Sequence, residues 1–298
     1  MRVFVTGATG FIGSAVIGEL LNSGHEVVGL ARSDKAAMAL TAVGAHVHRG
    51  SLENLESLRS GACEADGVIH LAYVHDFTDY VGAGVVDLRA VETIGTALEG
   101  SNKPFVVASG TLVLTPGRLG TEEDAPDLGT LAAPRAASER AAVEMARRGV
   151  RSSVVRLAPS VHDVEKTGFV GTLIDIARKN RFSAYIDDGK NRWPAVHRLD
   201  AAHLFCLALE KASGGTVLHG VAEEGVRFRD IADVIGRHLK LPVISINREE
   251  AGAHFGWLGA IVSADNPASS ALTQERLEWH PVHPGLISNL EHGSYFDS

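Results

Sequence analysis

The sequence has little cysteine and no excess of positive charge. Its two cysteines, Cys63 and Cys206, stand in no metal-ligand or disulfide motif, so we expect reduced thiols in a cytoplasmic protein. The 14 histidines are scattered without metal-ligand spacing, and no metal site is predicted. A net charge of −8 at pH 7, with no run of basic residues, argues against nucleic-acid binding.

Long apolar runs are also absent. No stretch reaches the roughly 18 consecutive apolar residues of a membrane-spanning helix, so no contact with a membrane is expected. A strand is predicted from about Arg2, which leaves no room for a signal peptide before it. The 298 residues, 45% of them hydrophobic, suffice for one large domain or two closely packed ones.

The first thirteen residues predict a strand, a glycine turn and a helix. Residues 3–5 are an apolar run of strand formers, three glycines follow at a spacing of three, and from Phe11 the apolar residues recur with helical spacing. Glycines let a pyrophosphate approach the main chain, and the free N–H groups of the helix N-terminus face its charge. We therefore predict a nucleotide site here. The residues predicted to bind the cofactor are Thr6, Gly7, Thr9, Gly10, Phe11, Ile12 and Gly13.

The stretch Thr-Gly-Ala-Thr-Gly-Phe-Ile-Gly at 6–13 resembles the cofactor motif of the short-chain dehydrogenase/reductase superfamily, in particular its extended epimerase/dehydratase branch and atypical relatives. Further matches at 188–202 and 273–286 extend the resemblance over nearly the whole chain. It implies an α/β fold, a Rossmann-type doubly wound parallel sheet with a small C-terminal substrate-binding lobe. The expected boundaries are 1–157 for the NAD(P)-binding domain, with 184–220 returning to it, and 158–183 with 221–298 for the small lobe.

The end of the second predicted strand, Ala31-Arg-Ser33, bears on the choice of cofactor. In this fold class that position meets the adenosine ribose, where an acidic residue favours NAD. Ala31 is neutral, Arg32 could pair with a 2′-phosphate and Ser33 could add a donor, so we predict NADP, with NAD as the alternative. A solvated loop charge is the other interpretation of Arg32. Further cofactor contacts follow from position or resemblance at Ser51, Leu52, Leu71, Ala72 and Pro159.

Tyr73 and His75 directly follow the fourth predicted strand, 67–72. Ligands of open α/β sheets lie beyond the carboxyl ends of the strands, so these side chains are placed to face the nicotinamide or the substrate. Either could donate a proton, and the ordinary pKa of histidine suits that task. The alternative is a polar loop. His70, at the strand end, is predicted to be a packed, hydrogen-bonded residue.

The fifth predicted strand, 105–108, leads into Ser109-Gly-Thr111. It resembles the family strand that ends in a catalytic Ser or Thr, whose hydroxyl orients the substrate carbonyl. Ser109 and Thr111 both stay candidates, because the intervening glycine leaves the register open by one or two residues.

The next predicted helix lacks the Tyr-x-x-x-Lys pair of this superfamily, in which Tyr is the general acid or base and Lys holds the ribose. Ser138 and Glu144 fit the extended pattern, and this register puts Arg135 at the Tyr position and Glu139 at the Lys position. Arg135 cannot act as an acid, because its pKa exceeds about 12, but it could polarise a carbonyl or hold a carboxylate. Glu139 could accept hydrogen bonds from the ribose. The alternative is an Arg–Glu pair that supports the helix.

In the second half of the chain, residues 156–162 resemble the family segment that closes over the nicotinamide, which makes His162 a further candidate proton donor. Asn191, Arg192 and Trp193 match positions that lie near the substrate in the extended family. The resemblance also implies a homodimer through helices at 76–99 and 134–148.

Three functions stay open. The first is an NADP-dependent oxidoreductase acting on a small carbonyl or alcohol, in which Ser109 or Thr111 orients the oxygen and Arg135 acts electrostatically. The second is an NAD-dependent nucleotide-sugar epimerase or dehydratase, which the missing Tyr counts against. The third is a non-catalytic regulator that senses NADPH or NADP. In each case the expected partner is a small molecule.

Overall fold

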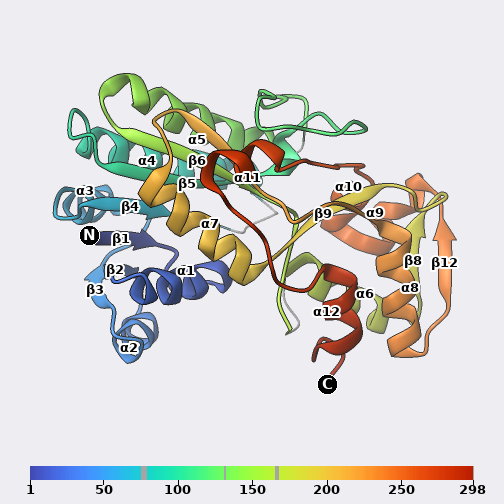
Figure 1. Cartoon of the computed structure of the whole chain (residues 1–298). Helices are drawn as coiled ribbons and strands as arrows, with labels where there is room; N and C mark the ends of the chain where they lie inside the picture. The colour runs from blue at the N-terminus through green and yellow to red at the C-terminus, as the bar shows by residue number, and fades with distance from the viewer. Residues whose placement is uncertain (75–78, 131, 165–167, 298) are drawn as a thin grey trace.

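The computed structural model describes residues 1–74, 79–130, 132–164 and 168–297, which form a larger and a smaller lobe (Figure 1). The larger lobe contains a seven-stranded sheet in the order β10-β6-β5-β4-β1-β2-β3, and all of its neighbouring strands are parallel. These strands are β1 (Arg2–Thr6), β2 (Glu26–Ala31), β3 (His46–Arg49), β4 (Gly67–His70), β5 (Pro104–Gly110), β6 (Arg151–Leu157) and β10 (Thr216–Gly220). The predicted Rossmann-type doubly wound sheet is confirmed.

Helices cover both faces of this sheet because its strands are apolar on both sides. In β1, Val3 and Val5 pack into one core and Phe4 into the other, and all three are fully buried. The first face carries α1 (Phe11–Asn22), α2 (Asp34–Ala42) and α7 (Arg198–Lys211); the second carries α3 (Leu55–Cys63), α4 (Tyr80–Ala97) and α5 (Ala133–Glu144) (Figure 1). Two short 3₁₀ helices, η1 (Thr111–Val113) and η2 (Met145–Arg148), follow β5 and α5.

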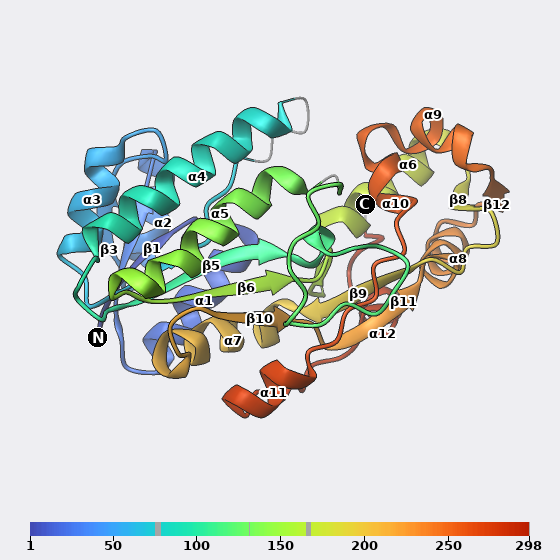
Figure 2. The same ribbon diagram turned by 90° about the horizontal axis from the view of Figure 1, so that it is seen from above.

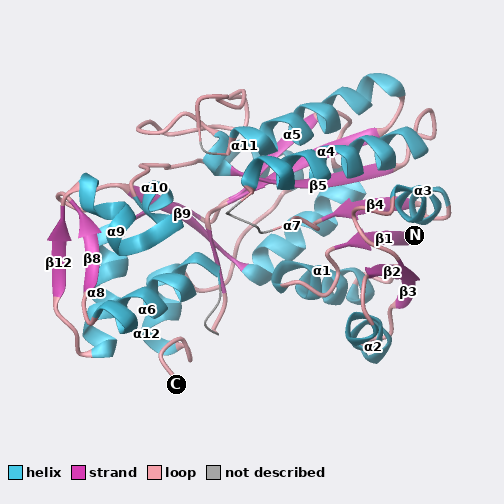
Figure 3. Cartoon of the chain, turned by 180° about the vertical axis from the view of Figure 1, so that it is seen from behind, coloured by secondary structure: helices cyan, strands magenta, loops and turns pink. Residues whose placement is uncertain are grey.

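The smaller lobe (Figure 3) packs around an apolar core of its own that includes Trp193, Phe228 and Tyr295. Its helices are α6 (Gly168–Asn180), α8 (Phe228–Leu239), η3 (Arg248–Glu250), α9 (Ala251–Phe255), η4 (Gly256–Leu258), α10 (Gly259–Val262) and α12 (Leu286–His292). One two-stranded sheet pairs β8 (Ser183–Ile186) with β12 (Val243–Ile246). A three-stranded sheet of β7 (Ser160–His162), β9 (Arg192–His197) and β11 (Glu223–Arg227) connects the lobes.

The predicted lobe boundaries differ from the structure at two places. Residues 184–191 were expected to return to the main sheet, but β8 pairs with β12, and Ala184 and Ile186 lie in the core of the smaller lobe. The chain rejoins the larger lobe at the end of β9, where Val196 enters its core, and continues there in α7. Conversely, α11 (Ala271–Leu277) packs on the larger lobe, and Trp279 donates its indole N–H to the Asp200 carbonyl at 3.1 Å. A four-residue apolar strand does not reveal from sequence which sheet it joins.

Helix α4 is the longest of the described helices, with 18 residues, and lies beside α5 on the outside of the sheet (Figure 2). No helix in the described ranges, α4 included, is long and apolar enough to cross a membrane. On α4, Val81 and Val85 are exposed. This is the surface for which the sequence predicts a contact between two copies, and homodimer formation stays a prediction.

Candidate active site at the end of the parallel sheet

The turn between β1 and α1 leaves no space for side chains. Gly7 has φ +69°, and a Cβ there would lie 2.7 Å from the Ala72 nitrogen. A Cβ on Gly13 would lie 2.0 Å from the Gly7 carbonyl oxygen. The Gly10 N–H bonds to the same carbonyl at 2.9 Å, which closes the turn just before α1 begins. This is the close-packed strand–turn–helix geometry that a dinucleotide pyrophosphate requires.

A groove of about 520 Å³ opens over this turn. Of the predicted cofactor residues, the ones that line it are Gly7, Gly10, Phe11, Ile12, Gly13, Leu71 and Pro159. Those that do not are Thr6, Thr9, Arg32, Ser33, Ser51, Leu52 and Ala72. The glycine cradle and the free end of α1 fit a dinucleotide, and contacts with its adenosine end stay predictions.

A row of buried hydrogen bonds connects the turn, through Thr6 and His70, to Asp87 on α4. The Thr6 hydroxyl lies 2.9 Å from His70 Nδ1, and His70 Nε2 lies 3.2 Å from the Asp87 carboxylate on α4. Thr6 Oγ1 also accepts the Ala72 N–H at 3.2 Å. Burial raises the pKa of Asp87, but the His70 hydrogen bond and the charge of Arg135 outweigh it and hold that pKa below its usual range. His70 is thus packed and hydrogen-bonded, as predicted.

At the far end of the sheet, Arg32 is exposed immediately after β2. Within the described residues its guanidinium has neither an ion pair nor a hydrogen bond. Ser33 caps α2, where its hydroxyl oxygen accepts the Ala36 N–H at 3.2 Å. Ser51 follows β3 and is half-buried, and Leu52 packs against the core. The predicted contact of Arg32 with a 2′-phosphate stays a prediction.

Arg135 lies beside two tyrosines at the mouth of the groove. It sits in the first turn of α5, where its Nη2 donates to the Ala108 carbonyl at 2.6 Å and its guanidinium lies 4.1 Å from the centre of the Tyr73 ring. The Tyr73 and Tyr80 rings are 6.0 Å apart, and all three side chains line the groove. Burial and the neighbouring Tyr80 raise the pKa of Tyr73, and the positive charge of Arg135 opposes that shift.

Tyr80 was not among the predicted site residues. In the structure it is the first residue of α4. A tyrosine seven residues after Tyr73, at the N-terminus of a helix that follows a strand, is the signal that would have identified it. His75, the other predicted proton donor of this loop, lies outside the described residues.

A second cavity, of about 770 Å³, adjoins the groove and shares with it Tyr80, Leu112, Ala132 and Phe169. Asn191 lines this cavity, and its amide donates to the Val262 carbonyl at 2.7 Å. The other two residues predicted near the substrate, Arg192 and Trp193, do not line it. The groove and the cavity together form one candidate site between the two lobes.

Comparison with known proteins agrees with this geometry. Residues 3–219 match the model of the NAD dependent epimerase/dehydratase family. The chain belongs to this family. It is 48% identical to an uncharacterized protein of Schizosaccharomyces pombe over 99% of this chain and the full length of that protein. It is 27% identical to 4-hydroxy-2-methyl-3-oxo-4-farnesyl-3,4-dihydroquinoline-1-oxide ketoreductase of Stigmatella aurantiaca, over 90% of this chain and 84% of the relative.

Among solved structures, the fold is similar to that of MoeE5 in complex with UDP-glucose and NAD, with a TM-score of 0.77 and 21% sequence identity over 99% of this chain and 98% of that one. This likeness establishes the fold. The family match shows a protein of the NAD dependent epimerase/dehydratase type, and the similar solved structure contains NAD.

The hydroxyls of Thr111 and Ser109, which were predicted to orient the substrate, both donate hydrogen bonds to other side chains of the protein. Thr111 is fully buried, and its hydroxyl donates to Asn266 at 2.8 Å, so the prediction that it orients a substrate is wrong. Ser109 does line the groove, but its hydroxyl donates to the Glu139 carboxylate at 2.9 Å. Only the lone pairs of Ser109 remain for a ligand.

Glu139 forms a buried ion pair with Arg156, a residue that the sequence reading did not single out. The two side chains are 2% and 1% exposed, and Arg156 Nη2 lies 2.5 Å from Glu139 Oε1. The pair lies beside a separate cavity and not in the cofactor groove. Both predicted roles of Glu139, the ribose contact and a pair with Arg135, are therefore wrong. The reason is the register of the sheet, which sets Ser109 opposite Arg156 on β6.

His162 is also not a proton donor at this site. It is 1% exposed, its Nδ1 bonds to the Asn289 amide at 2.9 Å, and it does not line the groove. Burial and the neighbouring His197 lower the pKa of His162 to about 4. The alternation of side chains along β7 explains the error, because Val161 faces the groove and His162 faces away from it toward Asn289 on α12.

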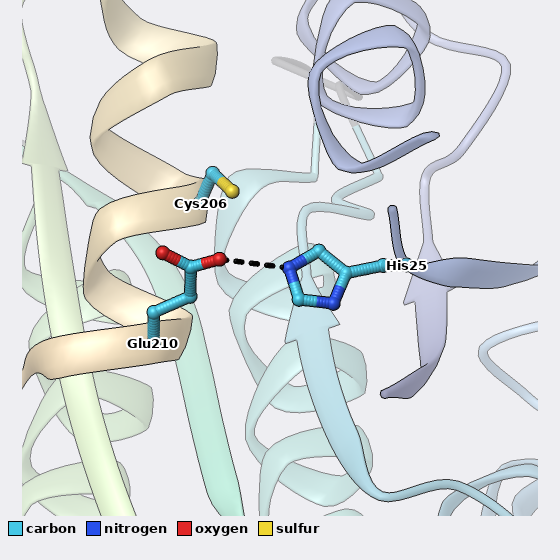
Figure 4. Close-up of side chains that lie close together, drawn as sticks. All are labelled: His25, Cys206 and Glu210. Atoms are coloured by element: carbon cyan, nitrogen blue, oxygen red, sulfur yellow. Dashed lines mark hydrogen bonds and ion pairs between the residues drawn. The ribbon is translucent and has the colours of Figure 1, made fainter. Parts of the chain in front are cut away.

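Within the described residues, one group of side chains comes close enough together to hold a metal ion: His25, Cys206 and Glu210 (Figure 4). His25 Nε2 bonds to Glu210 at 2.9 Å, and the Cys206 thiol lies 3.5 Å from the Ser23 hydroxyl. Burial raises the pKa of Cys206 to about 11, so its thiol is protonated near neutral pH. Hydrogen bonds between α7 and the start of β2 account for this group without a metal.

Proposed function

We propose that this protein is an NADP-dependent oxidoreductase that interconverts a carbonyl compound and its alcohol. The observation that carries the proposal is the Arg135–Tyr73–Tyr80 group, which faces the cofactor groove where the family's catalytic Tyr would stand. Arg135 Nε is buried and has no hydrogen-bond partner among the described residues. Arg135 as a whole lines the groove, so a carbonyl oxygen bound there can accept a hydrogen bond from its guanidinium.

Each residue of the site has a separate role in this reaction. The cradle of Gly7, Gly10 and Gly13 holds the pyrophosphate of the cofactor. When bound, NADPH supplies the hydride that goes to the carbonyl carbon, and a proton added to the oxygen completes the alcohol. Arg135 stabilises the negative charge that develops on that oxygen, and the Tyr73 hydroxyl donates the proton. The ketoreductase named among the relatives supports this reaction class.

The direct test is oxidation of NADPH by the purified protein with a panel of aldehydes and ketones, followed at the absorbance of the reduced nicotinamide. Turnover that depends on the carbonyl and yields the matching alcohol supports the proposal. Tight NADPH binding with no turnover of any carbonyl would instead favour the sensing regulator.

A nucleotide-sugar epimerase or dehydratase stays the second candidate, because the family and MoeE5, bound to UDP-glucose and NAD, favour it. That chemistry removes a proton from a sugar hydroxyl, a step that would fall to Tyr73 just as it does when an alcohol is oxidised, so the substrate and not the proton transfer separates the two candidates. Incubation with UDP-glucose and NAD, analysed for the 4-epimer and for loss of water, would identify this activity.

The pH profile of reduction should identify the donor. Burial raises the pKa of Tyr73 above its ordinary value of 10.0. Because the protonated hydroxyl is the active form, we expect the rate of the chemical step to hold from about pH 6 to about pH 9 and to fall only above about pH 10. If the rate instead falls as the pH rises through about 6.5, and if His75→Gln abolishes that fall, the proton comes from His75.

Arg32→Ala tests the choice of cofactor. If Arg32 binds the 2′-phosphate, its loss should weaken NADPH binding about tenfold and leave NADH binding unchanged. Titration of both cofactors by fluorescence measures the ratio. Lys35→Ala is the matched control, since Lys35 is an exposed cation on α2. An unchanged NADPH to NADH ratio in Arg32→Ala would assign Arg32 to the solvent.

A further inference from the structure

The cavity beside the cofactor groove has a mainly apolar wall drawn from both lobes. Leu112 and Leu114 follow β5, Phe169 lies on α6, and Trp257 and Ile261 come from the helical segment after β12. The rings of Phe169 and Trp257 pack edge to face, with their centres 5.9 Å apart. A volume of about 770 Å³ is in the range of cavities that bind drug-sized molecules.

The charges of this wall do not favour an anion. Its charged side chains, among the described residues, are Asp127, Asp265 and Arg248. Asp265 forms an ion pair with Arg192 at 2.8 Å, so the two charges cancel. Asp127 accepts the Gly129 N–H at 2.8 Å and the Thr115 hydroxyl at 3.0 Å, and these bonds hold its pKa below the usual range. The negative charge of Asp127 therefore offsets the positive charge of Arg248 in the sum over the wall.

Polar groups gather at the end of the cavity that meets the groove. Tyr80 belongs to both spaces, and Tyr73 and Arg135 lie next to it on the groove side. A carbonyl placed there has donors on its oxygen, and the rest of its molecule extends along the wall that the Phe169 and Trp257 rings form. A largely apolar space with donors at one end suits a ketone or aldehyde carried on rings.

We propose that this cavity takes an uncharged, largely apolar carbonyl compound of one or two rings, and that it discriminates against sugar nucleotides and carboxylates. The proposal names the substrate class of the function proposed above and rests on it. A diphosphate carries two or more negative charges, and the described residues of the cavity wall supply no excess of positive charge to offset them.

The experiment compares three probes on the intact protein: 1-tetralone, a carboxylate derivative of 1-tetralone, and UDP-glucose. Affinity is measured by calorimetry in the presence of NADP, and kcat/KM is measured separately with NADPH. We expect 1-tetralone to bind and to react at least about tenfold better than its carboxylate, and UDP-glucose to show no binding at about 1 mM. Equal or tighter binding of the carboxylate or of UDP-glucose would overturn the proposal, and so would a failure of 1-tetralone to bind.

The two readouts separate this proposal from the function on which it rests. If 1-tetralone binds selectively but is not reduced, the cavity is as described and the oxidoreductase activity fails. If both tetralones are reduced equally well, the activity stands and the discrimination fails.

Trp257→Ala tests whether 1-tetralone binds in the cavity. It should weaken 1-tetralone binding about tenfold, because an aromatic ring is removed from the wall, and should leave NADPH affinity within about twofold. Val282→Ala is the control, since Val282 is exposed and lies on neither the groove nor the cavity. Unchanged 1-tetralone affinity in Trp257→Ala would show that the compound binds elsewhere.

Discussion

Replacing Arg135 by methionine should lower kcat for carbonyl reduction by about a hundredfold or more and change NADPH affinity little. The expected size follows from removal of one preorganised donor for a developing oxyanion, which costs about 10²–10³ in kcat. The guanidinium lies over Tyr73 and keeps one buried N–H without a partner among the described residues, whereas the cofactor is held mainly by the glycine turn. Steady-state kinetics with saturating NADPH, together with a cofactor titration, measure the two effects.

Two further variants separate charge from shape. Arg135→Lys keeps the positive charge but loses the planar fork, so a partial recovery of kcat relative to methionine is expected. Tyr73→Phe removes the hydroxyl and leaves the ring under Arg135, and it should lower kcat by about a hundredfold. If Arg135→Met and Tyr73→Phe both retain nearly full kcat while their thermal unfolding is normal, the reacting oxygen does not face this group.

Local sequence patterns predicted the part of the protein that binds the cofactor. The apolar run at residues 3–5, which is fully buried, and the three-residue spacing of the glycines both act within one strand–turn–helix unit. The conformation of that unit is set by backbone geometry that only glycine allows. The fold of the larger lobe and the groove over the turn could therefore be predicted from the sequence, helped by a motif that is itself local.

The catalytic half of the site depends on pairing between distant segments, which the sequence does not state. Glu139 was assigned from the family register that Ser138 and Glu144 set, yet its partner is Arg156 on β6, which the register of β5 and β6 brings opposite Ser109. The Thr111 hydroxyl is likewise taken by Asn266, 155 residues further along the chain. Hydroxyl and carboxylate groups at the right spacing were visible in the sequence, but what they bond to was not.

The buried ion pair of Glu139 with Arg156 should contribute more to the stability of the fold than the exposed pair of Arg147 with Glu144. Arg156→Met leaves the Glu139 carboxylate buried with only the Ser109 hydroxyl as a described partner, and we expect the free energy of unfolding to fall by about 3–5 kcal/mol. Urea denaturation of the cofactor-free protein, followed by circular dichroism, measures this loss. The control is Arg147→Met, whose exposed pair with Glu144 on the outer surface should contribute almost nothing.

The double variant Glu139→Leu with Arg156→Met tests whether the ion pair serves the stability of the fold or the position of Ser109. Removing both charges should restore much of the lost stability, because an apolar pair avoids the cost of burying ions, although Ser109 and His219 each lose a bonding partner. If the double variant is stable but reduces carbonyls poorly, the pair serves the site by fixing Ser109 at the groove. If Arg156→Met alone unfolds at the same urea concentration as the native protein, water already reaches the pair from the cavity beside it, and the pair adds little to the fold.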